Sequence, residues 1–450
     1  MSIEDLQKDR NEAALADFTR AIELDPNYAW ALYQRGQILR EQGQREEALA
    51  DFQRAAELDR DDSAIYAELG ETLRLLRRHD ESVAAFSRAL ELDPAYAWAL
   101  GSRGQTYRAL RRYEEALVDF ERALAVKPDM AWVAAERAET FRTLGRYDEA
   151  VTGFTRAIEL DPVYVWAIGH RAICYREQNR YAEALTDLDH AIAISPPQAW
   201  LFAERGESRR LLDQLDEALD DLHHAIELDP EYAWAFGSRG ATYRSMGQLD
   251  EALADFGHAI ELDPAYVWVI MQRGMLHRSA NRQDEALADF SRALELDPRH
   301  SGAYAERGEI YRLRRAYDLA LADFTQAVKL RPQYAWALGS RGQTYRALGR
   351  YEEAVADLSA ALELHPEASW AIAERGECYR QLERYEEAVA DFTRALELNP
   401  KDSWALSRRG AAYQAMKIFE EAFIDLSRAI ELDPDNAWAW AQRGSLFRQM

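Results

Sequence analysis

The stretch AWALGSRGQTYRALRRYEEALVDFERALAVKP, residues 97–128, decides the fold because close copies of it fill almost the entire sequence. The clearest marker of these copies is a tryptophan that returns at intervals of 34 residues. The members of this series are Trp30, Trp98, Trp132, Trp166, Trp200, Trp234, Trp268, Trp336, Trp370, Trp404 and Trp438. Only Ala64 and Gly302 interrupt it, and no residue is inserted or lost along the series. An unbroken period of this length predicts a solenoid of stacked units.

Each unit contains two stretches with the periodicity of an amphipathic helix. We number positions from the residue before the tryptophan, so that Ala97 is position 1 and Pro128 is position 32. Small and apolar residues recur at positions 1, 4, 8 and 11 and again at 20, 24, 27 and 28, which are helical spacings. The polar segment 111–115 between them predicts a turn, and the closing proline starts the next connection. Each unit is therefore predicted to be a helical hairpin, and the chain to be all-α.

Composition excludes several classes of function. The net charge of −24 argues against sequence-independent binding to nucleic acid and to anionic membranes. No apolar run reaches the ~18 residues that a membrane span needs, and the N-terminus does not resemble a signal peptide. Cys174 and Cys378 lie six repeats apart, and two free thiols are typical of a reducing compartment. We therefore expect a folded, cytoplasmic protein.

The repeated positions resemble a known family. Gly or Ala at position 8, Tyr at 11, Ala at 20, Phe at 24, Ala at 27 and Pro at 32 resemble the tetratricopeptide repeat. The resemblance implies a right-handed superhelical α-solenoid of about 13 helix-turn-helix units, with first helices lining a concave groove. It also implies a non-enzymatic protein-binding scaffold without a cofactor. We expect one solenoid over residues 1–450, with a partial first repeat (1–26), twelve full repeats (29–436) and a partial last repeat (437–450).

Arginine at position 7 departs from the usual pattern of the family, which has leucine there. Aspartate usually occupies position 23 on the second helix, and the one repeat with Leu69 at position 7 carries Ala85 at position 23. The two positions change together, and a buried arginine without a partner is costly, so we predict an Arg–Asp bridge between the helices. Gly153, which stands opposite Arg137, does not follow this rule.

Tryptophan at position 2 falls on the side of the first helix that faces the groove in the resembling fold. In one interpretation each ring packs across the neighbouring first helix, where position 5 is often small; in the other, the rings contact an extended ligand. Both remain open. A tyrosine often stands beside the tryptophan, at position 34. The candidate ligand contacts of this kind are Trp98, Trp166, Trp234, Trp336, Tyr96, Tyr164, Tyr232 and Tyr334.

Arginine at position 12 lies on the same side of the first helix. In repeats with glutamate at positions 6 and 9, an i,i+3 pair between positions 9 and 12 is expected. The other repeats lack these glutamates, and their arginines are predicted to be freer to meet a partner or to remain part of a solvated ladder. These candidates are Arg108, Arg176, Arg244 and Arg346. The lysines and asparagines of the family's carboxylate clamp are missing, so that ligand class is not carried over.

The pattern offers no support for catalysis or for a metal site. His190, His224 and His258 share one position in consecutive repeats, but helices about 10 Å apart cannot bring three imidazoles onto one metal. The leading hypothesis is a scaffold that binds an extended polypeptide in the concave groove. Two alternatives are a filament assembled head to tail through residues 1–26 and 437–450, and a groove for a glycan or single-stranded nucleic acid.

A longer period lies above the 34-residue repeat. Residues 97–116 and 335–354 differ only where Arg111 stands against Gly349, seven repeats further on. The pattern indicates a duplicated block, whose groove features should recur and suit a long or repeating partner.

Overall fold

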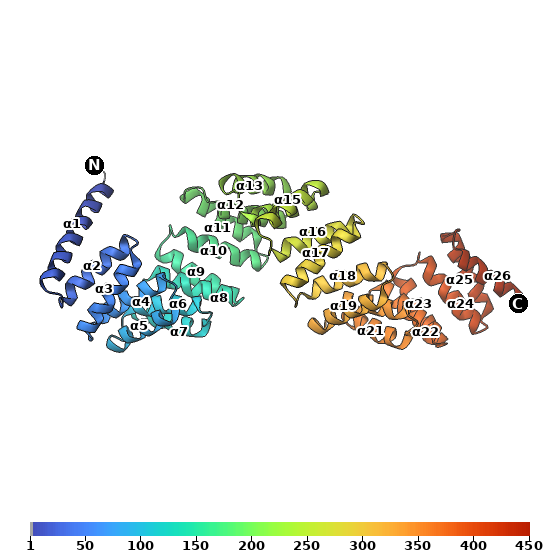
Figure 1. Ribbon diagram of the computed structural model, residues 1–450. Coiled ribbons are helices and arrows are strands. Elements are labelled where there is room, and N and C mark those ends of the chain that lie inside the picture. Colours follow the sequence, from blue (N-terminus) through green and yellow to red (C-terminus); the bar gives the residue numbers. More distant parts are fainter. Residues whose placement is uncertain (1–2) are drawn as a thin grey trace. The chain divides into compact units, whose positions relative to one another are not determined.

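The computed structural model describes the backbone of residues 3–450 and the side chains of residues 10–450, and every regular element in this part is an α-helix (Figure 1). The all-α prediction is confirmed. The chain forms two compact units, Met1–Ser238 and Arg239–Met450. The single continuous solenoid expected from the sequence stays a prediction. No helix within the described residues is both long and apolar enough to cross a membrane.

Twenty-six helices follow one another within residues 3–450. The first unit contains α1 (Ile3–Leu24), α2 (Ala29–Glu41), α3 (Arg45–Leu58), α4 (Ser63–Leu75), α5 (His79–Leu92), α6 (Ala97–Ala109), α7 (Tyr113–Val126), α8 (Ala131–Thr143), α9 (Tyr147–Leu160), α10 (Val165–Glu177), α11 (Tyr181–Ile194), α12 (Ala199–Leu211) and α13 (Leu215–Leu228). The division between the units falls inside α14 (Ala233–Ser245). The second unit continues with α15 (Leu249–Leu262), α16 (Val267–Ser279), α17 (Gln283–Leu296), α18 (Ser301–Leu313), α19 (Tyr317–Leu330), α20 (Ala335–Ala347), α21 (Tyr351–Leu364), α22 (Ser369–Gln381), α23 (Tyr385–Leu398), α24 (Ser403–Ala415), α25 (Phe419–Leu432) and α26 (Ala437–Gln449).

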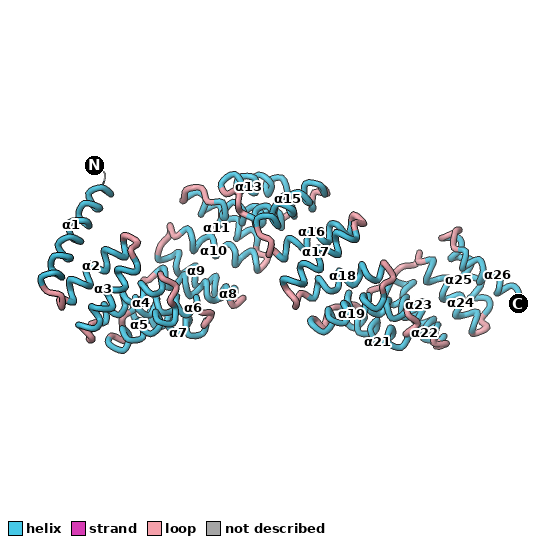
Figure 2. Tube along the Cα trace, viewed as in Figure 1, coloured by secondary structure: helices cyan, strands magenta, loops and turns pink. Residues whose placement is uncertain are grey.

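Short loops join these helices into hairpins (Figure 2). In both units a first helix packs on its own second helix and on the second helix before it, as α6 packs on α7 and α5. Successive first helices also approach within 8 Å between Cα atoms, for example α4 and α6 or α18 and α20. Within each unit, no pair of successive second helices among the described residues does so to the same extent. Each stack therefore bends towards its first helices, which form the inner face.

A glycine at position 8 allows the close approach of the paired helices. A Cβ atom on Gly104 would lie 2.6 Å from the ring of Phe120, which is fully buried. The exceptional Gly153 faces Ala138 at position 8, and a Cβ on Gly153 would lie 2.8 Å from the Ala138 methyl group. Ala172 also occupies position 8, yet Asp187 stands opposite it and bridges Arg171, so an alanine at position 8 does not by itself exclude the aspartate.

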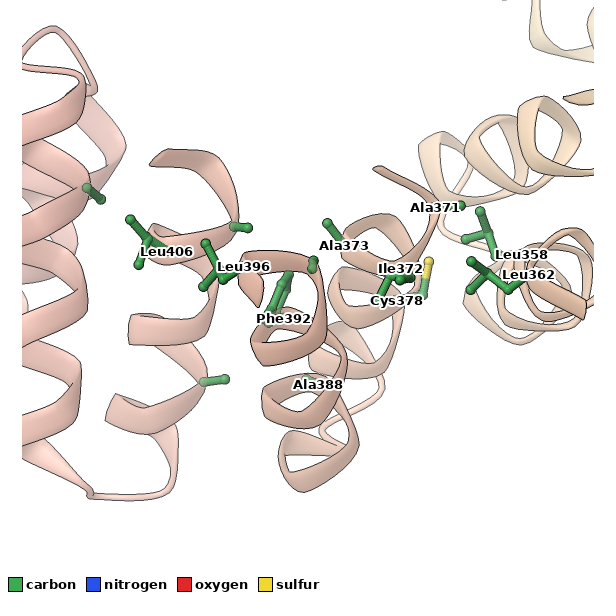
Figure 3. Close-up of a cluster of buried hydrophobic side chains, with 14 of the residues drawn as sticks. Leu358, Leu362, Ala371, Ile372, Ala373, Cys378, Ala388, Phe392, Leu396 and Leu406 are labelled. Carbon is green, nitrogen blue, oxygen red and sulfur yellow. The ribbon is translucent and has the colours of Figure 1, made fainter. Parts of the chain in front are cut away.

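The apolar stripes of the hairpins join into a core that continues from repeat to repeat. Figure 3 shows part of this core in the second unit, where Leu358, Ile372, Cys378, Phe392 and Leu406 come from successive helices. All five side chains are buried. Each hairpin thus covers its apolar face only through its neighbours, as a solenoid requires.

The turn inside each hairpin places position 15 in the left-handed region of backbone conformation. Arg111 has φ 59° and Gly349 has φ 75° at this position. Glycine adopts this conformation without the steric cost that other residues carry. Most turns nevertheless carry another residue there, namely Arg77, Arg111, Asn179, Asp213, Asn281, Arg315, Glu383 and Lys417.

One detail differs from expectation within the partial first repeat. Residues 1–8 align with positions 7–14 of the repeat, which predicts a truncated first helix before a full second helix, but α1 runs unbroken over Ile3–Leu24. An uninterrupted helix pairs the backbone groups along its whole length, whereas a turn would leave several of them without an internal partner.

Candidate protein-binding face

The predicted bridge between positions 7 and 23 is confirmed. Nε and Nη2 of Arg103 donate to the two carboxylate oxygens of Asp119 at 2.7 and 2.8 Å. The same bridge joins Arg35 and Asp51, Arg171 and Asp187, Arg205 and Asp221, Arg239 and Asp255, Arg273 and Asp289, Arg307 and Asp323, Arg341 and Asp357, Arg375 and Asp391, and Arg409 and Asp425. The aspartate side chains are almost fully buried. Position 7 is therefore structural.

The same arginine also ties its repeat to the one before. Nη1 of Arg103 donates to the hydroxyl oxygen of Ser87 at 3.0 Å, and Ser87 lies on the preceding second helix, α5. Equivalent bonds reach Thr19, Thr155, Ser291, Thr325, Ser359, Thr393 and Ser427. Sequence reasoning missed this contact, although the recurrence of Ser or Thr at position 25 was visible.

The tryptophans at position 2 pack between repeats. A Cβ on Gly101 would lie 2.5 Å from the Trp132 ring, so the indole covers the position-5 glycine of the preceding first helix. Trp200 covers Gly169 and Trp370 covers Gly339 in the same way. The packing interpretation is therefore correct for these rings. The tryptophan rings nevertheless remain at the surface, because packing covers them only in part.

The aromatic candidates from the sequence form adjacent pairs. Tyr96 lies 6.0 Å from Trp98 between ring centroids, and Trp98 meets Phe86 of the preceding second helix edge-on at 6.2 Å. Tyr164, Tyr232 and Tyr334 lie in the same way against Trp166, Trp234 and Trp336. All eight side chains are half-buried. The most exposed rings of the series are others: Trp30 at 53%, Trp370 at 42% and Trp268 at 38%.

The expectation that four position-12 arginines lack strong partners is wrong. Arg108 pairs with Glu136 at 2.7 Å, Arg176 with Glu204 at 3.0 Å and Arg346 with Glu374 at 2.5 Å. Arg244 donates to Gln272. In each case the partner stands at position 6 of the following repeat. Helical spacing within one helix predicts only the i,i+3 pairs, so this contact between helices was missed.

Glutamates at positions 6 and 9 on this face therefore pair with the arginines at position 12. A glutamate at position 6 receives the arginine of the repeat before it, while a glutamate at position 9 receives the arginine of its own helix. Glu139 and Arg142, for example, are 2.7 Å apart, next to the pair of Glu136 and Arg108. These charges are mutually compensated and partly buried. The inner face consequently offers few cations to a ligand.

Arg408 is the exception at position 6. Its guanidinium lies 3.7 Å from the ring centroid of Trp438 and 5.5 Å from that of Trp404. Within residues 10–450 its Nε is buried without a hydrogen-bond partner. Burial lowers the pKa of Arg408.

A hollow of about 820 Å³ opens beside the inner face where the loops before α6 and α8 meet. Aromatic rings and aspartates from neighbouring repeats line it. No group of three or more histidine, cysteine, aspartate or glutamate side chains among the described residues is arranged to hold a metal ion.

Models of the tetratricopeptide repeat match most of the chain. One matches residues 102–164, 136–199, 271–335 and 340–403, and others match 61–129, 29–62, 233–266 and 4–39. The chain belongs to the tetratricopeptide repeat family. Residues 419–450 also match the protein prenyltransferase alpha subunit repeat. No curated protein matches the chain.

The chain is similar to several solved structures, of which the first named supports a shared fold. The APC/C hetero-tetramer Cut9–Hcn1 is 16% identical, with a TM-score of 0.50 over 98% of this chain and 94% of that chain. YrrB, described as a TPR protein with an unusual peptide-binding site, is 26% identical, with a TM-score of 0.38 over 42% of this chain and 97% of its own. MamA is 25% identical, with a TM-score of 0.31 over 36% and 94%.

Proposed function

We propose that this tetratricopeptide-repeat protein is a non-enzymatic scaffold that holds an extended polypeptide along the inner face of its first helices. The observation that carries the proposal is the row of half-exposed tryptophan–tyrosine pairs on that face, represented by Tyr96 with Trp98 and Tyr334 with Trp336. The pairs recur with the repeat, and an extended chain is the ligand shape that can use a recurring series of contacts. Aromatic rings supply a large contact area at a low cost in conformational entropy.

The paired arginines favour a polypeptide over a nucleic acid. A single strand bound through its phosphates needs cations that are free to replace counterions. Arg108, Arg176 and Arg346 are already engaged with glutamates of the next repeat. Contacts through the aromatic rings, together with hydrogen bonds to the peptide backbone, remain available on this face.

The test is a peptide-display selection on the purified chain, followed by measurement of the affinity of the selected peptides for matched variants. Trp268→Ala removes an exposed ring of the inner face, and Val118→Ala removes a side chain of α7 that is 55% exposed. We expect the first change to weaken binding at least tenfold and the second to leave it unchanged. Equal affinities for both variants and for the unaltered chain, across several unrelated peptides, would refute binding on the inner face.

A second proposal is self-association through helices α26 and α1. Gly444 of α26 has open space where other position-8 glycines meet a Phe or Leu side chain, and Arg443 beside it has no carboxylate partner among the described residues. On α1, Asp17 is exposed and Phe18 is half-buried, and these stand at the positions that complete such pairs in other repeats. In the proposed contact, Phe18 of a second copy packs against Gly444 and Asp17 pairs with Arg443.

Charge exchange tests the proposed contact by sedimentation velocity at high concentration. Arg443→Asp and Asp17→Arg should each abolish association, and an equal mixture of the two single variants should restore it, because every contact between unlike variants then joins an acidic residue to a basic one. A chain that sediments as a monomer at every concentration rejects this assembly.

A further inference from the structure

The 820 Å³ hollow in the first unit has aromatic walls. Tyr96 and Trp98 line it, Trp132 and Tyr164 come from the following repeat, and Met130 lines it between them in sequence. The four rings are half-buried, and Met130 is 8% exposed. In this repeat Met130 occupies position 34, where the flanking repeats have tyrosine. The hollow therefore lies where one member of the tyrosine row is absent.

Carboxylates stand at the mouth of the same hollow. Asp93, Asp129 and Asp161 line it, with Lys127 as the one cationic lining residue. Oδ1 of Asp93 accepts from the backbone N–H of Ala95 at 3.0 Å, and Oδ1 of Asp161 accepts from that of Val163 at 3.2 Å. These bonds use one oxygen of each group and fix the turns that carry them. The second oxygen of each carboxylate can face a ligand.

Burial and the negative charges of this region raise the pKa of the tyrosines in the hollow. Burial raises the pKa of Tyr96, and the charges of Glu68, Asp62 and Asp93 raise it further. Burial also raises the pKa of Tyr164, with additional contributions from Glu136 and Asp161. A field that disfavours a phenolate in this way favours a bound cation.

The net charge of the chain and the pairing of the inner-face arginines both agree with this local negative field. The sequence carries a net charge of −24. The arginines that could offset it on the inner face are engaged in pairs with glutamates. Aromatic faces add to the preference because a cation is attracted to the electron-rich face of a ring, most strongly to tryptophan.

We propose that this hollow binds one basic side chain of the partner polypeptide, with arginine preferred over lysine. The proposal rests on the proposed function, since it names a subsite for the extended polypeptide held beside the first helices. The planar guanidinium can stack on Trp98 or Trp132 while its N–H groups point to the carboxylates at the rim. Lysine provides the charge without the planar stacking surface.

The experiment uses the full chain labelled with 5-fluorotryptophan and followed by fluorine NMR. Each resonance is assigned from a single Trp→Phe variant, and the probe is N-acetylarginine amide. We expect saturable shifts of the Trp98 and Trp132 resonances, while that of Trp404 in the other unit stays in place. The uncharged isostere N-acetylcitrulline amide should cause no such shifts. Equal shifts with citrulline, or equal shifts of every tryptophan, would overturn the proposal.

A matched pair of variants isolates the carboxylate. Asp161→Asn removes one charge from the hollow and keeps an oxygen that can accept the turn hydrogen bond. This change should weaken binding of the probe about fivefold, which is the effect of one charge about 4 Å away in water. Asp263→Asn is the control, because Asp263 makes the same turn contact to Ala265 at 3.0 Å but does not line this hollow. Equal affinities of the two variants would contradict a charged site here.

The same probe separates failure of this site from failure of the proposed function. If selected peptides bind on the inner face but replacement of their arginines by citrulline changes nothing, the basic subsite is wrong and the scaffold stands. If N-acetylarginine amide binds at Trp98 and Trp132 while no peptide responds to changes on the inner face, the subsite stands and the extended binding mode is wrong.

Discussion

The bridge between Arg103 and Asp119 leads to a prediction about stability, and other repeats of the chain supply the controls. The side chain of Asp119 is 3% exposed and that of Arg103 is 14% exposed. Arg103→Leu removes both hydrogen bonds from the buried carboxylate and leaves it only the exposed Arg122, 3.9 Å away, so we expect a cost of about 3 kcal/mol, the lower end for breaking a buried ion pair. The double change Arg103→Leu with Asp119→Ala reproduces the pair Leu69 and Ala85 of an earlier repeat. Replacing a buried ion pair by apolar groups is often neutral, so we expect the double variant to recover most of the loss.

Hydrogen exchange followed by mass spectrometry measures this effect locally. A repeat array need not unfold in one step, so a single melting temperature would not report on one hairpin. Peptides from α6 and α7 should exchange at least a hundredfold faster in the single variant, because each 1.4 kcal/mol changes an opening equilibrium tenfold. Arg443→Leu serves as the control, because Arg443 lacks such a carboxylate partner among the described residues. If Arg103→Leu alone costs no more than the double variant, the bridge does not stabilise the hairpin as described.

Three further predictions concern single positions. Arg111 holds φ 59°, so Arg111→Gly should raise the stability of its hairpin by about 0.5–1 kcal/mol, measured by local hydrogen exchange; slower refolding without added stability would contradict this. Gly104→Ala should destabilise its hairpin by about 1–2 kcal/mol, because the added methyl group would press on a buried Phe ring. Gly444→Ala, with nothing within 4 Å of the added methyl group, should instead stabilise by about 1 kcal/mol through helix propensity. Shifts in melting temperature of the same sign for both variants would contradict this packing. Burial raises the pKa of Cys174 to about 12, so its thiol should resist alkylation at pH 8 until urea unfolds the repeat, and rapid labelling of the native chain would show that the site opens.

Much of the hairpin was predictable because its contacts lie within one repeat. The Arg–Asp bridge could be inferred because the exchange to Leu69 and Ala85 changed both partners at once. The close approach at position 8 followed from the small residue in a core stripe. These inferences needed only helix periodicity and the cost of a buried charge.

Contacts between repeats were harder to predict because they depend on how one hairpin is displaced along the next. Arg108 meets Glu136, 28 residues further on, rather than a residue of its own helix. A signal was nevertheless present. Gln105 and Gln343 at position 9 precede repeats with glutamate at position 6, and each donates to that glutamate. The order of the repeats, rather than the content of one repeat, carried this information.

The pairing of the arginines changes what the inner face can recognise. Free arginines would have made this face a site for acidic ligands, in conflict with the net charge of −24 of the chain. Because Arg108, Arg176 and Arg346 are compensated by glutamates, their contribution to the field at the surface is small beyond a few ångströms. The remaining field is that of the acidic turns, such as those carrying Asp93 and Asp161. In the proposed binding mode, the ion pairs that tie successive first helices together also favour basic partners, so stability and specificity would depend on the same residues.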